Sequence, residues 1–179
     1  HCREITVVSY RSKAIHPSIF TIMESYLLTI GIPTYNRKKK LEHCLELISK
    51  HEDIEKVEVL ISDNASTDGT EDFLIEYVSQ KSNRRYIRNA ENLGFDRNIL
   101  TLYKEARGKY IWYFSDDDEM LPGAIKRILT ILQEQKPDVL YPNQTDSKGI
   151  KNISDGNFLD VLQYFPTGQG VRVKTDVAF

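Results

Sequence analysis

Short apolar runs alternate with amphipathic segments along this chain from about residue 26 onward. The run at residues 27–32 is apolar except for Thr29 and Gly31, which is typical of a strand buried on both faces of a parallel sheet. The chain repeats this kind of segment several times. Strands are therefore predicted at residues 27–32, 57–61, 85–88, 110–114 and 138–141.

Between these strands, apolar side chains recur at intervals of three and four residues, which is the spacing of one helix face. Asp68 lies three residues before Glu71 and predicts the N-cap of the second helix, and Gly108 is predicted to end the third. Four successive strand–helix pairs predict an α/β fold with a mostly parallel sheet and helices on both faces. The helical stripes span residues 41–48, 73–78, 95–106 and 121–132.

The two ends of the chain lack this alternation. Residues 1–22 begin with His1, show no clear period and contain no signal-peptide apolar core, so they are predicted to be an extension or cloning remnant with little defined structure. The alternating pattern occupies residues 23–142. It weakens over residues 143–179, where only a short helix at 158–165 is predicted, and this segment is expected to begin an incomplete second half of the domain.

Composition narrows the class of protein. The 179 residues include 24 Lys+Arg and 26 Asp+Glu, with 40% hydrophobic and 28% charged residues, which is typical of a folded globular domain. The near-neutral balance argues against a nucleic-acid partner, because nonspecific binding to nucleic acid needs a basic excess. Cys2 and Cys44 form no CxxC motif, which disfavours a disulfide scaffold or a zinc ribbon. No apolar run approaches the roughly 18 residues of a membrane-spanning helix.

An acidic cluster directly follows the most apolar strand. In open parallel sheets, ligands bind at the carboxyl ends of the strands. Residues 116–119 are four carboxylates placed just after the strand at 110–114, where like charges in low-dielectric surroundings repel strongly. A hard divalent cation removes that cost, and carboxylate oxygens are the ligands that Mg²⁺ and Mn²⁺ prefer. An acidic turn that points into solvent is an equal alternative.

Polar side chains also follow the first two strands. Asp63 stands at the tip of the second strand, where its carboxylate can accept a hydrogen bond from a nucleobase N–H. Thr34 and Tyr35 are predicted to line the same pocket, and ordinary packing is the alternative for the tyrosine ring. A capped turn explains Asp68 and Gly69 without any ligand.

Basic residues near the strand ends suggest phosphate contacts. Arg37 is a candidate phosphate ligand, whereas the lysines at 38–40 are typical of a solvated helix start. Arg97 and Asn98, on the helix before the aromatic strand, are candidates for contacts with ribose or phosphate, with solvent-facing positions as the equal alternative. Cys44 is interpreted as a small buried hydrophobe.

Taken together, these segments resemble the family-2 glycosyltransferases of the GT-A fold over about residues 26–142. Residues 92–98 look most like bacterial transferases that build O-antigen and other surface polysaccharides. The resemblance implies a Rossmann-like domain in which residues 23–142 bind the nucleotide sugar and residues 143–179 begin the acceptor half. It rests on the sequences at residues 32–37, 61–70, 92–98 and 110–118.

The resemblance also implies roles for individual side chains. Counting back from Pro122 places Ser115 at the first position of the family motif Asp-x-Asp-Asp. Asp117 then becomes the main ligand of Mg²⁺ or Mn²⁺ with Asp118 assisting, and a motif that begins at Asp116 is the alternative. The residues expected to bind the nucleotide sugar are Pro33, Thr34, Tyr35, Arg37, Asp63, Asn64, Arg97, Asn98 and Asp116.

The implied activity is metal-dependent, inverting transfer of a sugar from a nucleotide-diphosphate donor to a saccharide or lipid-linked acceptor. Such an enzyme is expected in the cytoplasm, with peripheral association at the inner face of the membrane left open. No catalytic base is assigned, because in the family it lies in the acceptor half. The alternatives are a non-catalytic nucleotide-binding fragment, or another metal-dependent nucleotidyltransferase. The latter would need a glycine-rich phosphate loop after the first strand, and residues 33–35 do not supply one.

Overall fold

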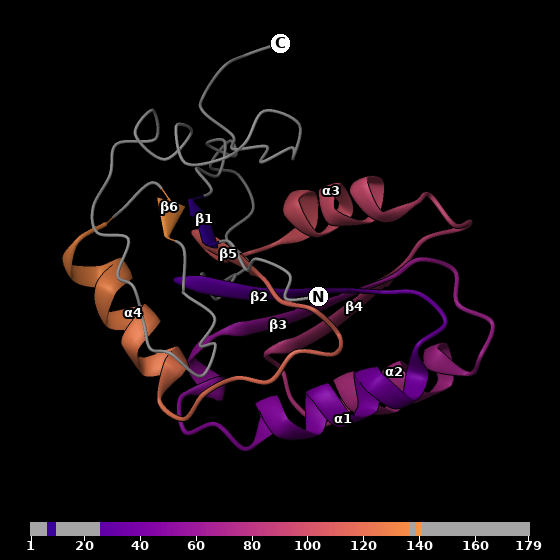
Figure 1. Cartoon of the computed structure of the whole chain (residues 1–179), viewed down its shortest axis with the longest axis horizontal. Helices are drawn as coiled ribbons and strands as arrows, with labels where there is room; N and C mark the ends of the chain where they lie inside the picture. Colours follow the sequence, from indigo (N-terminus) through magenta and orange to yellow (C-terminus); the bar gives the residue numbers. More distant parts are fainter. Residues whose placement is uncertain (1–6, 10–25, 137–138, 141–179) are drawn as a thin grey trace, which may run out of the picture.

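The computed structural model describes residues 7–9, 26–136 and 139–140, and within them the chain forms one six-stranded sheet (Figure 1). The strand order across the sheet is β4-β3-β2-β5-β1-β6. Central β2 carries the first long apolar run and lies between β3 and β5. The strands are β1 Val7–Ser9, β2 Leu28–Thr34, β3 Glu58–Asp63, β4 Arg84–Arg88, β5 Tyr110–Tyr113 and β6 Val139–Leu140.

Parallel pairing joins four adjacent strands, from β4 at one edge of the sheet to β5. β2 pairs in parallel with both β3 and β5, and β3 pairs in parallel with β4. β1 is antiparallel to both of its neighbours, β5 and β6. The predicted mostly parallel α/β architecture is therefore confirmed. β1 lies within the N-terminal extension, where the sequence pattern indicated no strand; the rest of that extension, and residues 143–179 with the helix expected at 158–165, lie outside the described residues.

Helices cover both faces of the sheet, as predicted (Figure 1). α1, α2 and α4 contribute to one large apolar cluster with alternate residues of β2, β3 and β5, among them Ile30, Ile61 and Trp112. α3 packs on the opposite face, where Leu102 meets Leu60 and Ile111. The helices are α1 Lys38–Ser49, α2 Thr70–Ser79, α3 Phe95–Glu105 and α4 Ala124–Glu134, with a short 3-10 helix at Ile54–Lys56.

The start of α2 differs from the prediction. Gly69, not Asp68, occupies the N-cap position, and its φ of 83° lies in the left-handed region that suits glycine. Asp68 instead links two helix starts, because one of its carboxylate oxygens accepts from the Thr70 amide at 3.2 Å and the other from the Lys38 amide at 2.9 Å. The predicted N-cap position is therefore wrong by one residue, whereas the interpretation of Asp68 and Gly69 as a capped turn is confirmed.

The buried faces of two helices begin later in the sequence than predicted, and α3 ends earlier than predicted. Phe95 and Leu121 were expected on buried faces, yet their exposed fractions are 61% and 53%. α3 ends at Glu105, followed by Ala106 in an extended conformation, so the prediction that Gly108 ends this helix is wrong. Gly108 is required for a different reason: its amide donates to the Thr29 hydroxyl at 2.8 Å while its backbone lies against β2.

Replacing Gly108 with alanine should lower the free energy of unfolding by about 1–3 kcal/mol, because overpacked sites force backbone shifts. A Cβ atom there would lie 2.5 Å from the Thr29 amide nitrogen and 2.7 Å from the Leu28 carbonyl carbon. Gly31→Ala is the matched control, since its nearest neighbours would be side-chain atoms of Ile111 at 3.1 Å and Leu102 at 3.5 Å rather than backbone. Denaturant titration measures both variants, and an equal loss in the two would contradict the close-approach argument.

No helix in the described part of the chain is both long enough and apolar enough to cross a membrane.

Candidate functional site

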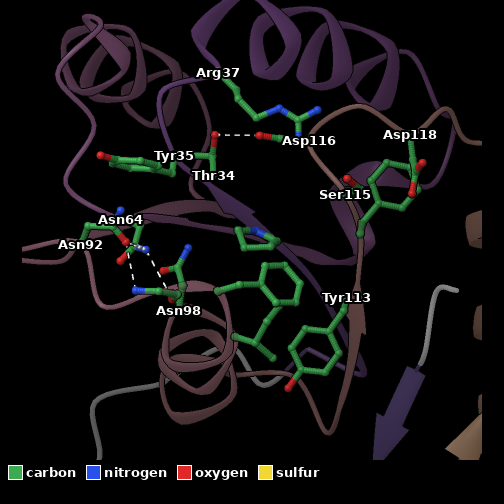
Figure 2. Close-up of a pocket in the computed structure, with 15 residues that line it drawn as sticks. Thr34, Tyr35, Arg37, Asn64, Asn92, Asn98, Tyr113, Ser115, Asp116 and Asp118 are labelled. Carbon is green, nitrogen blue, oxygen red and sulfur yellow. Dashed lines mark hydrogen bonds and ion pairs between the residues drawn. The ribbon is translucent and has the colours of Figure 1, made fainter. Parts of the chain in front are cut away.

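A pocket of about 320 Å³ opens at the carboxyl edge of the sheet, where β2, β3 and β5 end. Its walls come from the segments after these strands and from the start of α3 (Figure 2). Its size falls within the range of small-molecule sites. The lining residues are Pro33, Thr34, Tyr35, Arg37, Asn64, Asn92, Gly94, Phe95, Asn98, Ile99, Tyr113, Phe114, Ser115, Asp116 and Asp118.

Thr34, Arg37 and Asp116 form the polar centre of one side of the pocket (Figure 2). The Thr34 hydroxyl donates to one carboxylate oxygen of Asp116 at 2.9 Å, and the Arg37 guanidinium pairs with the other at 2.8 Å. Asp116 is only 2% exposed. Burial raises the pKa of its carboxyl above the ordinary value, although the Thr34 hydrogen bond and the Arg37 charge oppose the shift. These contacts bring together residues from the ends of two neighbouring parallel strands, as the sequence predicted.

Asp117 faces a different set of partners. Its carboxylate accepts from the Ser115 hydroxyl at 2.6 Å and pairs with Arg37 and, at 3.3 Å, with Lys40. The Ser115 hydrogen bond, helped by Arg37 and Lys40, lowers the pKa of Asp117 to about 2. Asp117 is not among the residues that line the pocket, although two of its partners, Arg37 and Ser115, do line it.

The buried face of α1 also contacts the acidic loop. The Cys44 thiol lies 3.6 Å from the Ser115 carbonyl oxygen, to which it donates. Burial, reinforced by the charges of the neighbouring aspartates, raises the pKa of this thiol to about 12. Cys44 is therefore an unreactive packing residue at 2% exposure, which confirms its interpretation as a small buried hydrophobe.

The expected metal can be tested against the carboxylates that are present. Asp118 lines the pocket and offers the hard oxygen donors that Mg²⁺ and Mn²⁺ prefer. Across the described residues, no group of three or more His, Cys, Asp and Glu side chains is arranged to hold an ion. Mg²⁺ is commonly held by one or two carboxylates together with substrate phosphates. The acidic loop therefore fits a site that a phosphate-bearing ligand completes.

Asparagine side chains build the opposite side of the pocket (Figure 2). The Asn64 amide nitrogen donates to the Asn92 side-chain oxygen at 2.7 Å. The Asn98 side chain binds Ser62 twice, accepting from its hydroxyl at 2.6 Å and donating to its carbonyl oxygen at 3.0 Å. Asn64 and Asn98 thus line the pocket, while much of their hydrogen-bonding capacity is used within the protein. Their binding of a nucleotide sugar stays a prediction.

Two predicted ligand residues lie elsewhere. Asp63 is fully buried, and its oxygens accept from the Ser66 amide at 3.0 Å and pair with Arg88. Side chains alternate along a strand, so Asp63 shares the face of Ile61, under α1 and α2. Both carboxylate oxygens of Asp63 therefore have partners within the protein, and neither is available for the predicted contact with a nucleobase. Arg97 is exposed on α3 and is not among the pocket-lining residues.

Sequence reasoning did not single out several residues of the pocket wall. Asn92 and Gly94 were named only as part of a motif, and Tyr113 only as part of a strand. Phe95 and Ile99 were assigned to a buried helix stripe. The sequence signal that could have identified Phe95 is its position directly after Gly94. In the structure, Gly94 has a φ of 79°, which turns the chain into α3 and places Phe95 at the start of the helix.

Two solved structures share this fold. TarS from S. aureus in complex with UDP-GlcNAc aligns with a TM-score of 0.57 and 23% identity, over 62% of this chain and 32% of TarS. The mannosyltransferase PcManGT from Pyrobaculum calidifontis, in complex with GDP-Man and Mn²⁺, aligns with a TM-score of 0.55 and 21% identity, over 64% of this chain and 34% of that one. These likenesses establish the GT-A fold.

The chain belongs to glycosyl transferase family 2, whose sequence pattern matches residues 29–160. It is 42% identical over 112 residues to the abequosyltransferase RfbV of Salmonella typhimurium. That match covers 61% of this chain and 33% of the relative. The chain therefore spans about a third of the length of this curated relative.

Proposed function

We propose that the pocket binds a nucleotide-diphosphate sugar, and that this chain carries the donor-binding half of a transferase of bacterial surface polysaccharide synthesis. The observation that carries the proposal is the buried Asp116, held by Thr34 and Arg37 at the carboxyl edge of a parallel sheet. Family membership and the similarity to an abequosyltransferase support a sugar-transfer reaction. The complexes of two fold neighbours with UDP-GlcNAc and with GDP-Man support a nucleotide-sugar donor.

Each lining residue has a chemical task in this proposal. The Tyr35 ring, 42% exposed at the pocket, supplies a surface on which the nucleobase stacks. The Asp116 carboxylate accepts hydrogen bonds from ribose hydroxyls while Thr34 fixes its orientation. Arg37 presents its guanidinium to the diphosphate, because a planar fork of N–H donors matches phosphate oxygens. Pro33, Asn64 and Asn98 shape the wall around the nucleoside.

Asp63 supports the pocket indirectly in this proposal and does not bind the nucleobase itself. Its ion pair with Arg88 and its hydrogen bond to the Ser66 amide hold the turn after β3. Arg88 also donates to the Ser66 carbonyl oxygen at 3.0 Å and pairs with Glu71 at 3.3 Å. Asp63 therefore supports the turn that leads from the pocket to α2.

Mg²⁺ or Mn²⁺ is proposed at the acidic loop, with Asp118 and Asp117 as the protein ligands and donor phosphates completing the coordination. When bound, such an ion neutralises the charge that develops on the departing diphosphate. Asp118 already lines the pocket. Asp117 is held by Arg37 and Lys40, so these two cations control how readily that carboxylate turns towards a ligand.

The reaction proposed for the whole protein is an inverting transfer to a saccharide or lipid-linked acceptor. The bond from the anomeric carbon to the diphosphate oxygen breaks and a bond to the acceptor oxygen forms. The acceptor proton passes to a carboxylate base, which we do not assign to any residue. The family is expected to act in the cytoplasm or at the inner face of the membrane.

Calorimetric titration with UDP-, GDP-, dTDP- and CDP-sugars, with and without Mn²⁺, tests the proposal. We expect one donor class to bind and its affinity to rise when Mn²⁺ is present. Asp118→Ala and Asp117→Ala should each abolish that rise while leaving metal-free binding in place. Glu119→Ala is the matched control: this exposed neighbour lies 4.0 Å from His43 and outside the pocket lining.

The possible results separate the two parts of the proposal. Failure of every donor to bind would refute the nucleotide-sugar site itself. An unchanged Mn²⁺ effect in both aspartate variants, or the same loss in Glu119→Ala, would refute the metal assignment and leave the donor site standing.

A further inference from the structure

Asn89 joins two pocket residues without itself lining the pocket. It follows β4 directly and is only 9% exposed. Its side-chain nitrogen donates to the side-chain oxygens of Asn64 and Asn98, both at 3.0 Å. Its backbone amide donates to the Asp63 carbonyl oxygen at 2.9 Å. Asn89 therefore connects the end of β3 to α3 behind the pocket wall.

Backbone groups determine which way each amide in this cluster points. The Leu93 amide can only donate, and it donates to the Asn64 side-chain oxygen at 3.0 Å. The Ser62 carbonyl oxygen can only accept, and it accepts from the Asn98 side-chain nitrogen at 3.0 Å. Both orientations leave a side-chain oxygen facing Asn89. Position 89 must therefore supply two N–H donors from one atom, which among short side chains only asparagine provides.

We propose that Asn89 is a positioning residue for nucleotide binding: it holds the carboxamides of Asn64 and Asn98 in the orientation that the pocket wall needs. This inference rests on the proposed donor site. Without the two donors, the Asn64 oxygen keeps only the Leu93 amide and the Asn98 oxygen keeps only the Ser62 hydroxyl. The Asn64 nitrogen still donates to Asn92 and the Asn98 nitrogen still donates to Ser62, so each carboxamide keeps its direction but is held less firmly. Part of the wall must then be ordered each time a nucleotide binds.

Asn83 provides a matched control within the same strand unit. It lies directly before β4, is 7% exposed, and its side-chain nitrogen donates to the carbonyl oxygens of Ile54 and Val57, both at 2.9 Å. It therefore has the same residue type, similar burial and the same number of hydrogen bonds donated by its side chain as Asn89. Neither Asn83 nor its two partners line the pocket.

The experiment compares Asn89→Ala with Asn83→Ala by denaturant unfolding and by calorimetric titration with the donor that the wild-type protein binds. Both variants should lose similar stability. Asn89→Ala should bind the donor about tenfold more weakly, the loss expected when two side chains of the wall must be ordered on binding, whereas Asn83→Ala should bind within about twofold of wild type. The side-chain amide NMR signals of Asn64 and Asn98 should shift in Asn89→Ala only.

Each other outcome overturns the inference. Equal weakening in both variants would mean that general destabilisation lowers affinity. If the wild-type protein binds the donor and Asn89→Ala binds it with the same affinity, the positioning role is rejected and the donor site stands. A wild-type protein that binds no nucleotide would refute the donor site and this inference together. If Asn89→Ala does not fold, Asn89→Ser, which keeps one donor, takes its place against Asn83→Ser.

Discussion

Replacing Glu58 with alanine should lower the free energy of unfolding by about 3–5 kcal/mol, because it removes one partner of a buried ion pair. Glu58 is fully buried in β3 and pairs with Arg85 at 2.7 Å. The same carboxylate accepts from the Thr29 hydroxyl at 2.6 Å and from the Arg107 amide at 2.7 Å. One side chain thus links β2, β3, β4 and the segment before β5, and its loss leaves buried donors unsatisfied.

Glu55→Ala is the matched control for this prediction. Glu55 pairs with Lys81 at the same distance, 2.7 Å, but both side chains are exposed, so we expect a change within about 0.5 kcal/mol. Denaturant titration followed by circular dichroism measures both variants. Similar losses in Glu58→Ala and Glu55→Ala would show that the buried network contributes no more than a surface pair.

Replacing Asp116 with asparagine should weaken donor binding about 10- to 100-fold, the effect expected when a hydrogen bond to a charged group is lost. The neutral amide retains the shape of the carboxylate but cannot form the ion pair with Arg37. The fold should tolerate the change, because burial of Asp116 disfavours its charged form, as its raised pKa indicates. Calorimetric titration with the preferred nucleotide sugar measures the loss.

Asp96→Asn is the control for Asp116→Asn. Asp96 lies in the first turn of α3 beside the pocket residue Phe95, but it is exposed and does not line the pocket. The affinity of Asp96→Asn for the donor should remain within about twofold of wild type. Donor binding by Asp116→Asn at wild-type strength would remove Asp116 from the site. A loss of folding in that variant would contradict the argument from burial.

Local pattern was sufficient for most of the secondary structure. Burial on both faces produces continuous apolar runs in the central strands, and packing on one face produces the helical stripes of α1, α2 and α4. The predicted strand ends were less accurate, because β2 continues through Pro33 to Thr34 and β3 continues through Ser62 to Asp63, where the two strands are still paired. Phe95 was misassigned because apolar spacing does not distinguish a core face from a pocket face.

The order of elements along the chain also predicted where a site would form. Parallel strands place their carboxyl ends on one edge of the sheet, so the residues after the strands were expected to meet. The Thr34–Asp116 hydrogen bond joins two such segments that are 82 positions apart. Asp63 and Asn64 could not be distinguished in the same way, because side-chain direction at a strand end depends on the pleat and on the arginine that β4 supplies.

Sequence by itself therefore determined the class of fold and the edge of the sheet at which chemistry gathers, because periodicity and the order of elements can be read along the chain. The family was indicated by the resemblance of its motifs. Only the tertiary structure decided that Arg37 lies between Asp116 and Asp117, and that Asn89 joins Asn64 to Asn98. Such pairings depend on how α1 and α3 are placed against the strand ends. That placement results from core packing of residues far apart in the chain, and it leaves no local trace in the sequence.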